Sequence, residues 1–359
     1  MMTTSTQKYS VAVVGATGAV GKQMLKILEQ RQFPMGDLRL FASERSVGKK
    51  IHYQGRDFVC EVMKPGCFDG VDFAFFDASD AVSKEWVKQA SDSGAWVIDN
   101  SATYRMDSDV LLTVPEVHEK EIQTLVKQAK QNKNWKSRVF AGPNCSTVQM
   151  VLPLKVLRDL FGLKRVIVST YQATSGAGAA AMDELREQTR LVLDDKPAKS
   201  EIFSHRIAFN CIPHIGGFKD DGYTSEEHKL MAETKRILGM PDLAVTATAV
   251  RVPTFACHSE SVYVECDREP DLAAFRKALS THAGISLIDE PEKARYPLAE
   301  AFVGDAVEPG AGRDPVYVGR IRRDPQVKTG ICFWVVSDNL RKGAALNAIQ
   351  IGEAIIRFS

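Results

Sequence analysis

The stretch from residue 9 to residue 30 constrains the fold more than any other part of the chain. It reads YSVAVVGATGAVGKQMLKILEQ. Residues 9–14 are mostly β-branched or apolar, which indicates a buried strand. Glycines stand at positions 15, 18 and 21, and apolar side chains then recur at helical spacing. The stretch therefore predicts a strand, a glycine-rich turn and an amphipathic helix over AVGKQMLKILEQ, residues 19–30.

A turn of this kind at the start of a helix can hold a phosphate group. Glycine lets the backbone approach a pyrophosphate, and the helix N-terminus offers free N–H groups and the positive end of a dipole. The GxxGxxG spacing differs from the commonest dinucleotide fingerprint, and a glycine turn kept for packing would look similar. We interpret the loop as a dinucleotide site and assign to it Gly15, Thr17, Gly18, Ala19 and Val20, with Ser79 at the end of a later strand.

The segment FASERSVGKK, at the end of the second expected strand, bears on which dinucleotide is bound. An acid at this place usually binds the ribose hydroxyls of NAD, and Glu44 can fill that role. Ser43, Arg45 and Ser46 surround it, and an arginine with hydroxyls suits a 2′-phosphate better. We therefore expect NADP as the cofactor. A solvated basic loop would explain the lysines that follow but not the hydroxyl spacing.

The first part of the chain continues to alternate strands and helices. The expected strands are LRLFAS, VDFAFFDAS, AWVIDNSA and SRVFAG, and SKEWVKQASDSG is an expected helix. Such alternation is typical of a parallel, doubly wound sheet. The expected fold class is α/β, beginning with a Rossmann-like, doubly wound NADP-binding domain.

The pattern changes near Cys145. STVQMVLPLKVLRDLFG reads as a helix that Pro153 should kink or end early. RVIVSTYQA is a further expected strand, and apolar residues over 182–193 mark a long helix. We expect antiparallel strands in DLAVTATAVRVPTF, ESVYVECD and PVYVGRIRRD, another strand in GICFWVVSDN, and a last helix in NLRKGAALNAIQIGEAII. We therefore expect an α+β catalytic and dimerisation domain with a mixed, largely antiparallel sheet over 145–338, and the NADP-binding domain over 1–144 and 339–359.

Composition narrows the classes of partner and compartment. The chain has 359 residues and a net charge of +1, so nothing in its charge favours nucleic acid or an anionic membrane. Its first apolar run, VAVVG, is too short for a signal peptide or a membrane span. The seven cysteines form no CxxC pair, and neither Cys60 nor Cys67 has a histidine at ligand spacing. We therefore expect reduced thiols in the cytoplasm, without a disulfide frame or a metal site.

Cys145, in the stretch AGPNCSTVQM, is a candidate nucleophile. It stands between an expected strand and an expected helix, and a helix N-terminus lowers the pKa of a thiol and stabilises the thiolate. Position alone favours a small core residue, because most lone cysteines are structural. A nucleophile also needs a base, and His258, His214 and His205 are all available, so the residue pattern does not choose among them.

The chain resembles the aspartate-β-semialdehyde dehydrogenase family. The matching segments run in order from end to end: VVGATGAVG, ASERSVGKK, SATYRMD, PNCST, STYQATSGAG, EEHK, RVPTFACHSES and VSDNLRKGAALNA. Their order and number make the resemblance highly specific. One departure is that Ala256 and Cys257 precede the histidine, where at least one glycine is expected.

The resemblance implies a role for each matching residue. It implies that Cys145 is the nucleophile, His258 the acid/base and Gln172 the residue that orients the acyl intermediate. It also implies that Arg251 binds the substrate carboxylate and Glu226 its amino group, with Lys229, Arg105 and Asn144 at the phosphate. Gly176 and Asn339 match residues near the nicotinamide, and Ser175 is also assigned to the cofactor. When each residue is considered alone, a simpler explanation remains. Glu226 and Lys229 could form an i,i+3 surface ion pair, Arg105 could be an exposed arginine, and Gln172 could be a polar strand end.

The implied activity is the reversible NADPH-dependent reduction of L-aspartyl-4-phosphate to L-aspartate-4-semialdehyde, with release of inorganic phosphate. It serves the biosynthesis of lysine (through diaminopimelate), threonine, methionine and isoleucine. An N-acetyl-γ-glutamyl-phosphate reductase has the same architecture and chemistry but has no use for an acid that binds a free amine. A non-catalytic, cofactor-binding relative would have lost the nucleophile, base or arginine, all of which are present. The expected assembly is a homodimer or a dimer of dimers.

Overall fold

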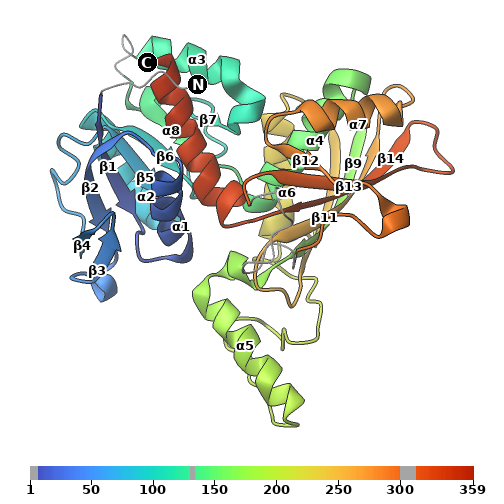
Figure 1. The fold of residues 1–359 in the computed structure, drawn as a ribbon, viewed down its shortest axis with the longest axis horizontal. Helices are drawn as coiled ribbons and strands as arrows, with labels where there is room; N and C mark the ends of the chain where they lie inside the picture. The colour runs from blue at the N-terminus through green and yellow to red at the C-terminus, as the bar shows by residue number, and fades with distance from the viewer. Residues whose placement is uncertain (1–6, 130–133, 300–312) are drawn as a thin grey trace. The chain divides into compact units, whose positions relative to one another are not determined.

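The computed structural model describes residues 7–129, 134–299 and 313–359. The chain forms two compact units (Figure 1). The first comprises Met1–Pro143 and Ala344–Ser359, and the second comprises Asn144–Gly343. Across the described residues, no helix is both long and apolar enough to cross a membrane.

The first unit is built on an eight-stranded sheet with the order β3-β4-β2-β1-β5-β6-β8-β7. All neighbouring strands are parallel except β3 and β4, which form an antiparallel hairpin. The predicted doubly wound sheet is thus confirmed. Its strands are β1 (Tyr9–Val14), β2 (Met35–Phe41), β3 (Lys50–Tyr53), β4 (Arg56–Glu61), β5 (Phe73–Phe76), β6 (Trp96–Asp99), β7 (Leu111–Leu112) and β8 (Val139–Ala141).

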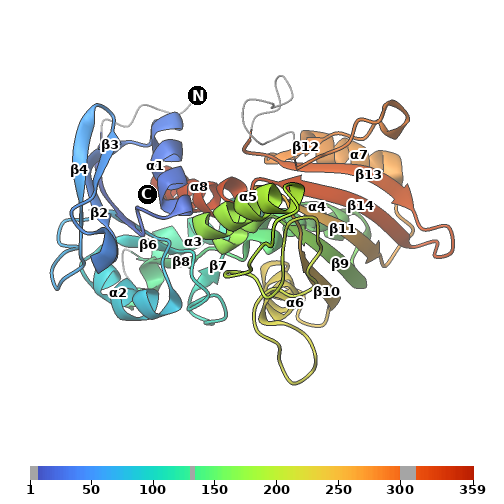
Figure 2. The same cartoon turned by 90° about the horizontal axis from the view of Figure 1, so that it is seen from below.

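Helices cover both faces of this sheet. Figure 2 shows α1 (Ala19–Gln30) and α2 (Asp80–Asp92) on opposite faces. Helix α8 (Leu346–Phe358) packs on α1 and on α3 (Pro115–Ala129), so the end of the chain completes the core of the first unit. Burial of α1 on the sheet follows from the apolar stripe that its sequence predicts.

The second unit contains a mixed six-stranded sheet with the order β10-β9-β11-β14-β13-β12. Helices α4, α6 and α7 pack on it, whereas α5 extends away from it (Figure 1). The strands are β9 (Arg165–Gln172), β10 (Ala244–Arg251), β11 (His258–Glu265), β12 (Ile285–Leu287), β13 (Val316–Arg323) and β14 (Gly330–Ser337). The helices are α4 (Cys145–Phe161), α5 (Ala179–Leu193), α6 (Ser225–Ile237) and α7 (Leu272–Thr281).

One expectation about this unit is wrong, and one of the two alternatives predicted for Pro153 is excluded. Strand β10 pairs with β9 in parallel, not antiparallel, because the chain returns through α5 and α6 before it enters β10. Helix α4 does not end early at Pro153 but continues to Phe161. Pro153 costs the helix one backbone hydrogen bond, and the surrounding side chains of α4 are almost all buried, so packing offsets that loss.

Candidate active site

Cys145 is the first residue of α4 and is partly exposed. Asn144 caps the helix, since its side-chain oxygen accepts from the N–H groups of Ser146 and Thr147 at 3.0 and 3.3 Å. Gly343 packs directly on the cysteine, because a Cβ placed on Gly343 would lie 3.0 Å from Cys145 Cβ. The thiol therefore lies at the positive end of a capped helix, a position that favours the thiolate.

Two glutamates of α6 hold Asn144 in place. Glu226 Oε1 accepts from the side-chain amide of Asn144 at 2.8 Å, and Glu233 Oε2 accepts from its backbone N–H at 2.6 Å. Both glutamates are buried, and they lie seven residues apart, which places them on one face of the helix. The sequence analysis missed Glu233, although its two-turn spacing from Glu226 was visible in the sequence.

Gln172 and Arg251 end two neighbouring parallel strands and lie directly opposite each other in the ladder. Both side chains are buried. Gln172 Nε2 donates to Glu226 Oε1 at 3.4 Å, and Arg251 Nη1 donates to the carbonyl of Ala173 at 2.8 Å. The parallel register thus places an amide and a guanidinium side by side at the ends of two strands, and the carboxylate of Glu226 on α6 contacts the amide.

His258 begins β11 and is fully buried. Its Nδ1 accepts from the N–H of Ala173 at 3.0 Å, and Nε2 has no hydrogen-bond partner in the described parts of the chain. A Cβ on Gly176 would lie 2.8 Å from Arg251 Nη1 and 3.1 Å from His258 Nε2. A glycine is therefore required where the backbone passes the arginine and the imidazole.

Charge and burial set the protonation states of these groups. Burial, and secondarily the charge of Arg251, lower the pKa of His258 well below its usual range, so the imidazole is neutral at pH 7. Burial also lowers the pKa of Arg251, whereas the nearby Cys145 and Glu226 raise it. Arg251 is thus electrostatically coupled to both the thiol and the carboxylate.

Three residues expected to bind the cofactor, Ser175, Gly176 and Asn339, also lie in the second unit. Asn339 Oδ1 accepts from the Ser175 hydroxyl and from the N–H of Cys257, both at 3.0 Å. Cys257 is fully buried and has a φ of 70°, a backbone conformation that glycine adopts more readily. This explains why a glycine is expected before His258, and burial raises the pKa of the Cys257 thiol well above its usual range.

Lys229 makes a 3.4 Å ion pair with Glu226, one turn earlier on α6. Glu226 is not part of a simple surface pair, because it is buried and also bonded to Asn144 and Gln172. Arg105 belongs to the first unit and is buried, with Nη2 donating to the carbonyl of Asn100 at 2.6 Å. It is therefore not an ordinary exposed arginine.

The glycine-rich loop lies at the carboxyl end of β1, where β2 and β5 flank that strand on its two sides. This point, at which the strand order reverses, is the usual ligand site of a doubly wound sheet. Gly15 has a φ of 88°, and a Cβ there would lie 2.0 Å from the carbonyl oxygen of Asp77. Gly18 is the N-cap of α1, whose first turn has neither a capping side chain nor an acid. These features leave backbone N–H groups for a pyrophosphate, and Thr17, Ala19 and Val20 share the same turn.

Ser43, Arg45 and Ser46 lie just beyond β2, where Ser43 precedes the short helix Glu44–Ser46. Ser43, Glu44 and Arg45 are exposed. Ser79 caps α2 by accepting from the N–H of Val82 at 3.5 Å. The loop can therefore offer both the acid and the arginine to a ribose, and its geometry alone does not choose between NAD and NADP.

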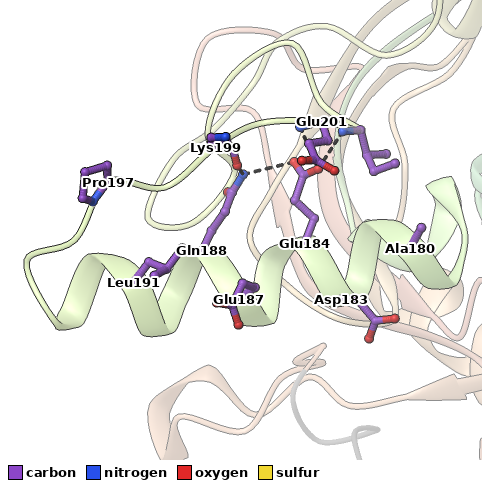
Figure 3. A pocket seen from close by; sticks show the side chains of 10 residues that line it. Ala180, Asp183, Glu184, Glu187, Gln188, Leu191, Pro197, Lys199 and Glu201 are labelled. Atoms are coloured by element: carbon purple, nitrogen blue, oxygen red, sulfur yellow. Dashed lines mark hydrogen bonds between the residues drawn. The ribbon is translucent and has the colours of Figure 1, made fainter.

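A separate hollow of about 570 Å³ lies between α5 and the segment that follows it (Figure 3). Glu184 accepts from the N–H groups of Glu201 and Ile202, and Gln188 donates to the carbonyl of Lys199. These hydrogen bonds hold on α5 a segment in which we found no sequence motif. None of the predicted site residues lines this hollow.

Comparison with known proteins assigns the family. Residues 10–125 match "Semialdehyde dehydrogenase, NAD binding domain", and residues 154–342 match "Semialdehyde dehydrogenase, dimerisation domain". The aspartate-semialdehyde dehydrogenase of Bacillus subtilis is 45% identical over 357 residues, covering 97% of this chain and 98% of its own.

Solved structures agree with these matches. Aspartate semialdehyde dehydrogenase II of Vibrio cholerae, complexed with ASA, has a TM-score of 0.89 and 41% identity, covering 98% of this chain and 99% of its own. The aspartate semialdehyde dehydrogenase of Candida albicans with NADP has a TM-score of 0.76 and 25% identity, covering 98% and 99%. This chain is therefore an enzyme of the aspartate-semialdehyde dehydrogenase family.

Proposed function

We propose that this enzyme reduces L-aspartyl-4-phosphate to L-aspartate-4-semialdehyde through a thioester on Cys145, and that it runs the reverse reaction when phosphate is present. The observation that carries the proposal is that buried Glu226 accepts hydrogen bonds from Asn144, which precedes Cys145, and from Gln172, which lies opposite Arg251 in the sheet. An arginine and a buried carboxylate near a thiol at a helix N-terminus match a substrate that has a carboxylate, an amine and an electrophilic acyl carbon.

Cys145 supplies the nucleophile. Its thiolate forms a C–S bond with the acyl carbon, the C–O bond to phosphate breaks, and inorganic phosphate leaves. When bound, the nicotinamide dinucleotide supplies the hydride that reduces the thioester carbonyl. The resulting alkoxide re-forms its C=O bond and expels the thiolate, which frees the aldehyde.

His258 acts on the carbonyl oxygen. Because Nδ1 accepts from a backbone N–H, the neutral ring carries its hydrogen on Nε2. Nε2 can then donate to the oxygen as negative charge develops on it. This geometry supports the donor half of the expected acid/base role. To take up a proton at Nε2, the neutral ring would have to carry its hydrogen on Nδ1 instead. The Ala173 N–H, which donates to Nδ1, disfavours that tautomer.

Arg251 and Glu226 determine the substrate class. The guanidinium fork binds a carboxylate in two places, and the buried glutamate binds an ammonium group. Asn144 uses its oxygen for the α4 cap and one amide hydrogen for Glu226, which leaves one hydrogen for a phosphate oxygen. As the family resemblance implies, we assign Lys229 and Arg105 to phosphate binding and Gln172 to the acyl group.

For the cofactor, we propose NADP rather than NAD. Arg45 is exposed and lies between Ser43 and Ser46, so it can form charge-assisted bonds to a 2′-phosphate. The solved relative from Candida albicans, which contains NADP, supports this choice.

We propose that two copies associate through the face of the second sheet that carries Tyr171 and Trp334. Their rings pack 5.4 Å apart, and Tyr171 is 37% exposed. A dimerisation-domain match over these strands supports a homodimer, and two such dimers can form a tetramer. Because Cys145 must stay reduced to react, we also propose a reducing, cytoplasmic compartment.

The test is a spectrophotometric assay of semialdehyde oxidation with and without inorganic phosphate, followed by a comparison of L-aspartyl-4-phosphate with N-acetyl-γ-glutamyl phosphate as oxidants of NADPH. We expect phosphate-dependent turnover and use of the aspartyl compound only. Glu226→Gln should raise KM for the semialdehyde more than KM for phosphate, because the carboxylate would contact the amine directly and the phosphate only through Asn144 and Lys229. Turnover that needs no phosphate, or a preference for the acetylated substrate, would overturn the proposal.

A further inference from the structure

Two buried polar side chains lie behind the candidate active site, between α4 and β11. Gln149 and Glu260 are both fully buried. Across the described residues, neither carboxyl oxygen of Glu260 and neither amide atom of Gln149 makes a hydrogen bond of standard geometry. The two groups nevertheless lie close enough for Gln149 to influence the carboxyl. No step of the proposed reaction uses either residue.

Their positions relate them to the two reacting side chains. Gln149 follows Cys145 by four residues, so it lies one turn further along the same side of α4. Glu260 follows His258 by two residues, so both side chains project from the same face of β11. Since α4 packs on β11, contact between Gln149 and Glu260 joins the helix of the nucleophile to the strand of the imidazole.

Among the described strands, neither residue that pairs directly with Glu260 is a cation. Thr170 of β9 and Val335 of β14 are its partners in the ladder, and both are uncharged. A carboxylate buried without a cation is strongly disfavoured, so the group remains protonated. Burial accordingly raises the pKa of Glu260 well above its usual range, and Gln149 opposes this only in part.

A neutral carboxyl and an amide are complementary. The carboxyl O–H can donate to Gln149 Oε1 while Gln149 Nε2 donates to the other carboxyl oxygen. Pro153 makes such a contact more important, because it has no N–H to give to the backbone carbonyl of Gln149. The turn after Cys145 therefore has fewer helical hydrogen bonds and depends more on side-chain anchors.

We propose that Gln149 and Glu260 form a carboxyl–amide pair that fixes the first turns of α4 on β11 and thereby positions Cys145 relative to His258. Glu260 is a positioning residue, because it acts through the helix and not on substrate. The proposal rests on the proposed role of Cys145 as nucleophile and adds to it a pair that touches no ligand. A neutral pair also keeps negative charge away from the Cys145 thiolate.

Four variants test this pair. Glu260→Gln keeps a neutral group that both donates and accepts, and Glu260→Leu removes hydrogen bonding at similar size. The double variant Q149E/E260Q exchanges the partners. Val262→Ala is the control, because Val262 is buried on the same face of β11 but lies one step further from His258. Each variant is assayed for kcat, KM, melting temperature and the rate at which iodoacetamide alkylates Cys145 between pH 6 and 9, with the site mapped by mass spectrometry.

We expect Glu260→Gln and the exchanged pair to stay within about twofold of wild type. Glu260→Leu should lower kcat and the alkylation rate by about 10- to 100-fold with little change in KM, because a small displacement of a reacting group is costly. Val262→Ala should lower only the melting temperature. Wild-type kcat and alkylation in Glu260→Leu, or equal impairment of Glu260→Gln and Glu260→Leu, would overturn the proposal.

The alkylation readout separates this inference from the proposed function. It reports the state of the Cys145 thiol whether or not the enzyme turns over. If Cys145→Ser kept wild-type turnover, the nucleophile assignment would fail, while the alkylation rates of the Glu260 variants would still decide whether the pair positions Cys145.

Discussion

His258 Nδ1 accepts a hydrogen bond of 3.0 Å from the backbone N–H of Ala173. The donor is a main-chain group, so the direction of this bond is unambiguous and the neutral ring carries its hydrogen on Nε2. The carbonyl of Ala173 meanwhile accepts from Arg251 Nη1 at 2.8 Å. One peptide segment thus orients both the imidazole and the guanidinium.

This relationship predicts the pH behaviour of a His258→Asn variant. Burial, and then the charge of Arg251, hold the pKa of His258 below its usual range, so the wild-type ring is already neutral between pH 6.5 and 8. The variant should lose roughly 10²- to 10³-fold in kcat, since it lacks a well-placed donor to the oxygen. Its pH profile over pH 6.5–8 should keep the wild-type shape. Disappearance of a wild-type ionisation in that range would show that His258 titrates there.

Thiol labelling should distinguish Cys145 from Cys257. Cys145 is partly exposed at a helix N-terminus, whereas Cys257 is fully buried and its thiol pKa is raised. Iodoacetamide at pH 7.5 should modify Cys145 at least about tenfold faster than Cys257. Peptide mapping by mass spectrometry measures both rates, and the exposed Cys211 serves as an accessible reference. Comparable labelling of Cys257 would contradict the buried position assigned to it.

Arg45→Gln tests the choice of dinucleotide. Losing a charge-assisted bond to a 2′-phosphate should raise KM for NADPH about 10- to 100-fold and leave KM for NADH within about twofold. Lys50→Gln is the matched control, because it removes a nearby exposed positive charge from β3. Steady-state kinetics with both cofactors provide the measurement. An equal effect of both substitutions would point to a general basic surface instead.

Asp77 gives a stability prediction with a defined sign. Burial raises its pKa to about 6, so between pH 4 and 6 the folded chain binds more protons than the unfolded chain and stability falls as pH rises. Asp77→Asn should therefore raise the melting temperature of the cofactor-free protein at pH 7.5 by roughly 5 °C, with a smaller gain at pH 5. Asp37→Asn, an exposed carboxyl in β2, should change neither value. A gain that grows toward acid pH would reverse the assigned sign.

Local periodicity predicted most of the first unit. The apolar stripe of α1 and the strand–glycine–helix order needed only neighbouring residues, and the structure places this helix over the same residues, Ala19–Gln30. The second unit was harder, because the pairing direction of β10 depends on where α5 and α6 return the chain. The local rule that proline ends a helix likewise failed at Pro153, because tertiary packing maintains α4 beyond this residue.

The site residues also divide into those that local sequence predicts and those that depend on the tertiary structure. Cys145 at a strand–helix junction is visible in the sequence, and the family resemblance added the partners that lie far from it in the chain. The Ala173 backbone contacts could not be predicted, because main-chain donors and acceptors leave no side-chain signal. Glu260 follows His258 by two residues in the sequence. Only the assignment of these residues to a strand shows that the two side chains share a face.

The most direct test of the central claim is a rapid-mixing experiment with the semialdehyde and NADP in the absence of phosphate. Without phosphate to accept the acyl group from Cys145, the reaction should stop after one hydride transfer, at the acyl-enzyme. We predict a burst of one NADPH per active site together with an acyl adduct on Cys145 in the mass spectrum, and neither in Cys145→Ala. Steady turnover without a burst, or a burst that persists in Cys145→Ala, would contradict a thioester on Cys145.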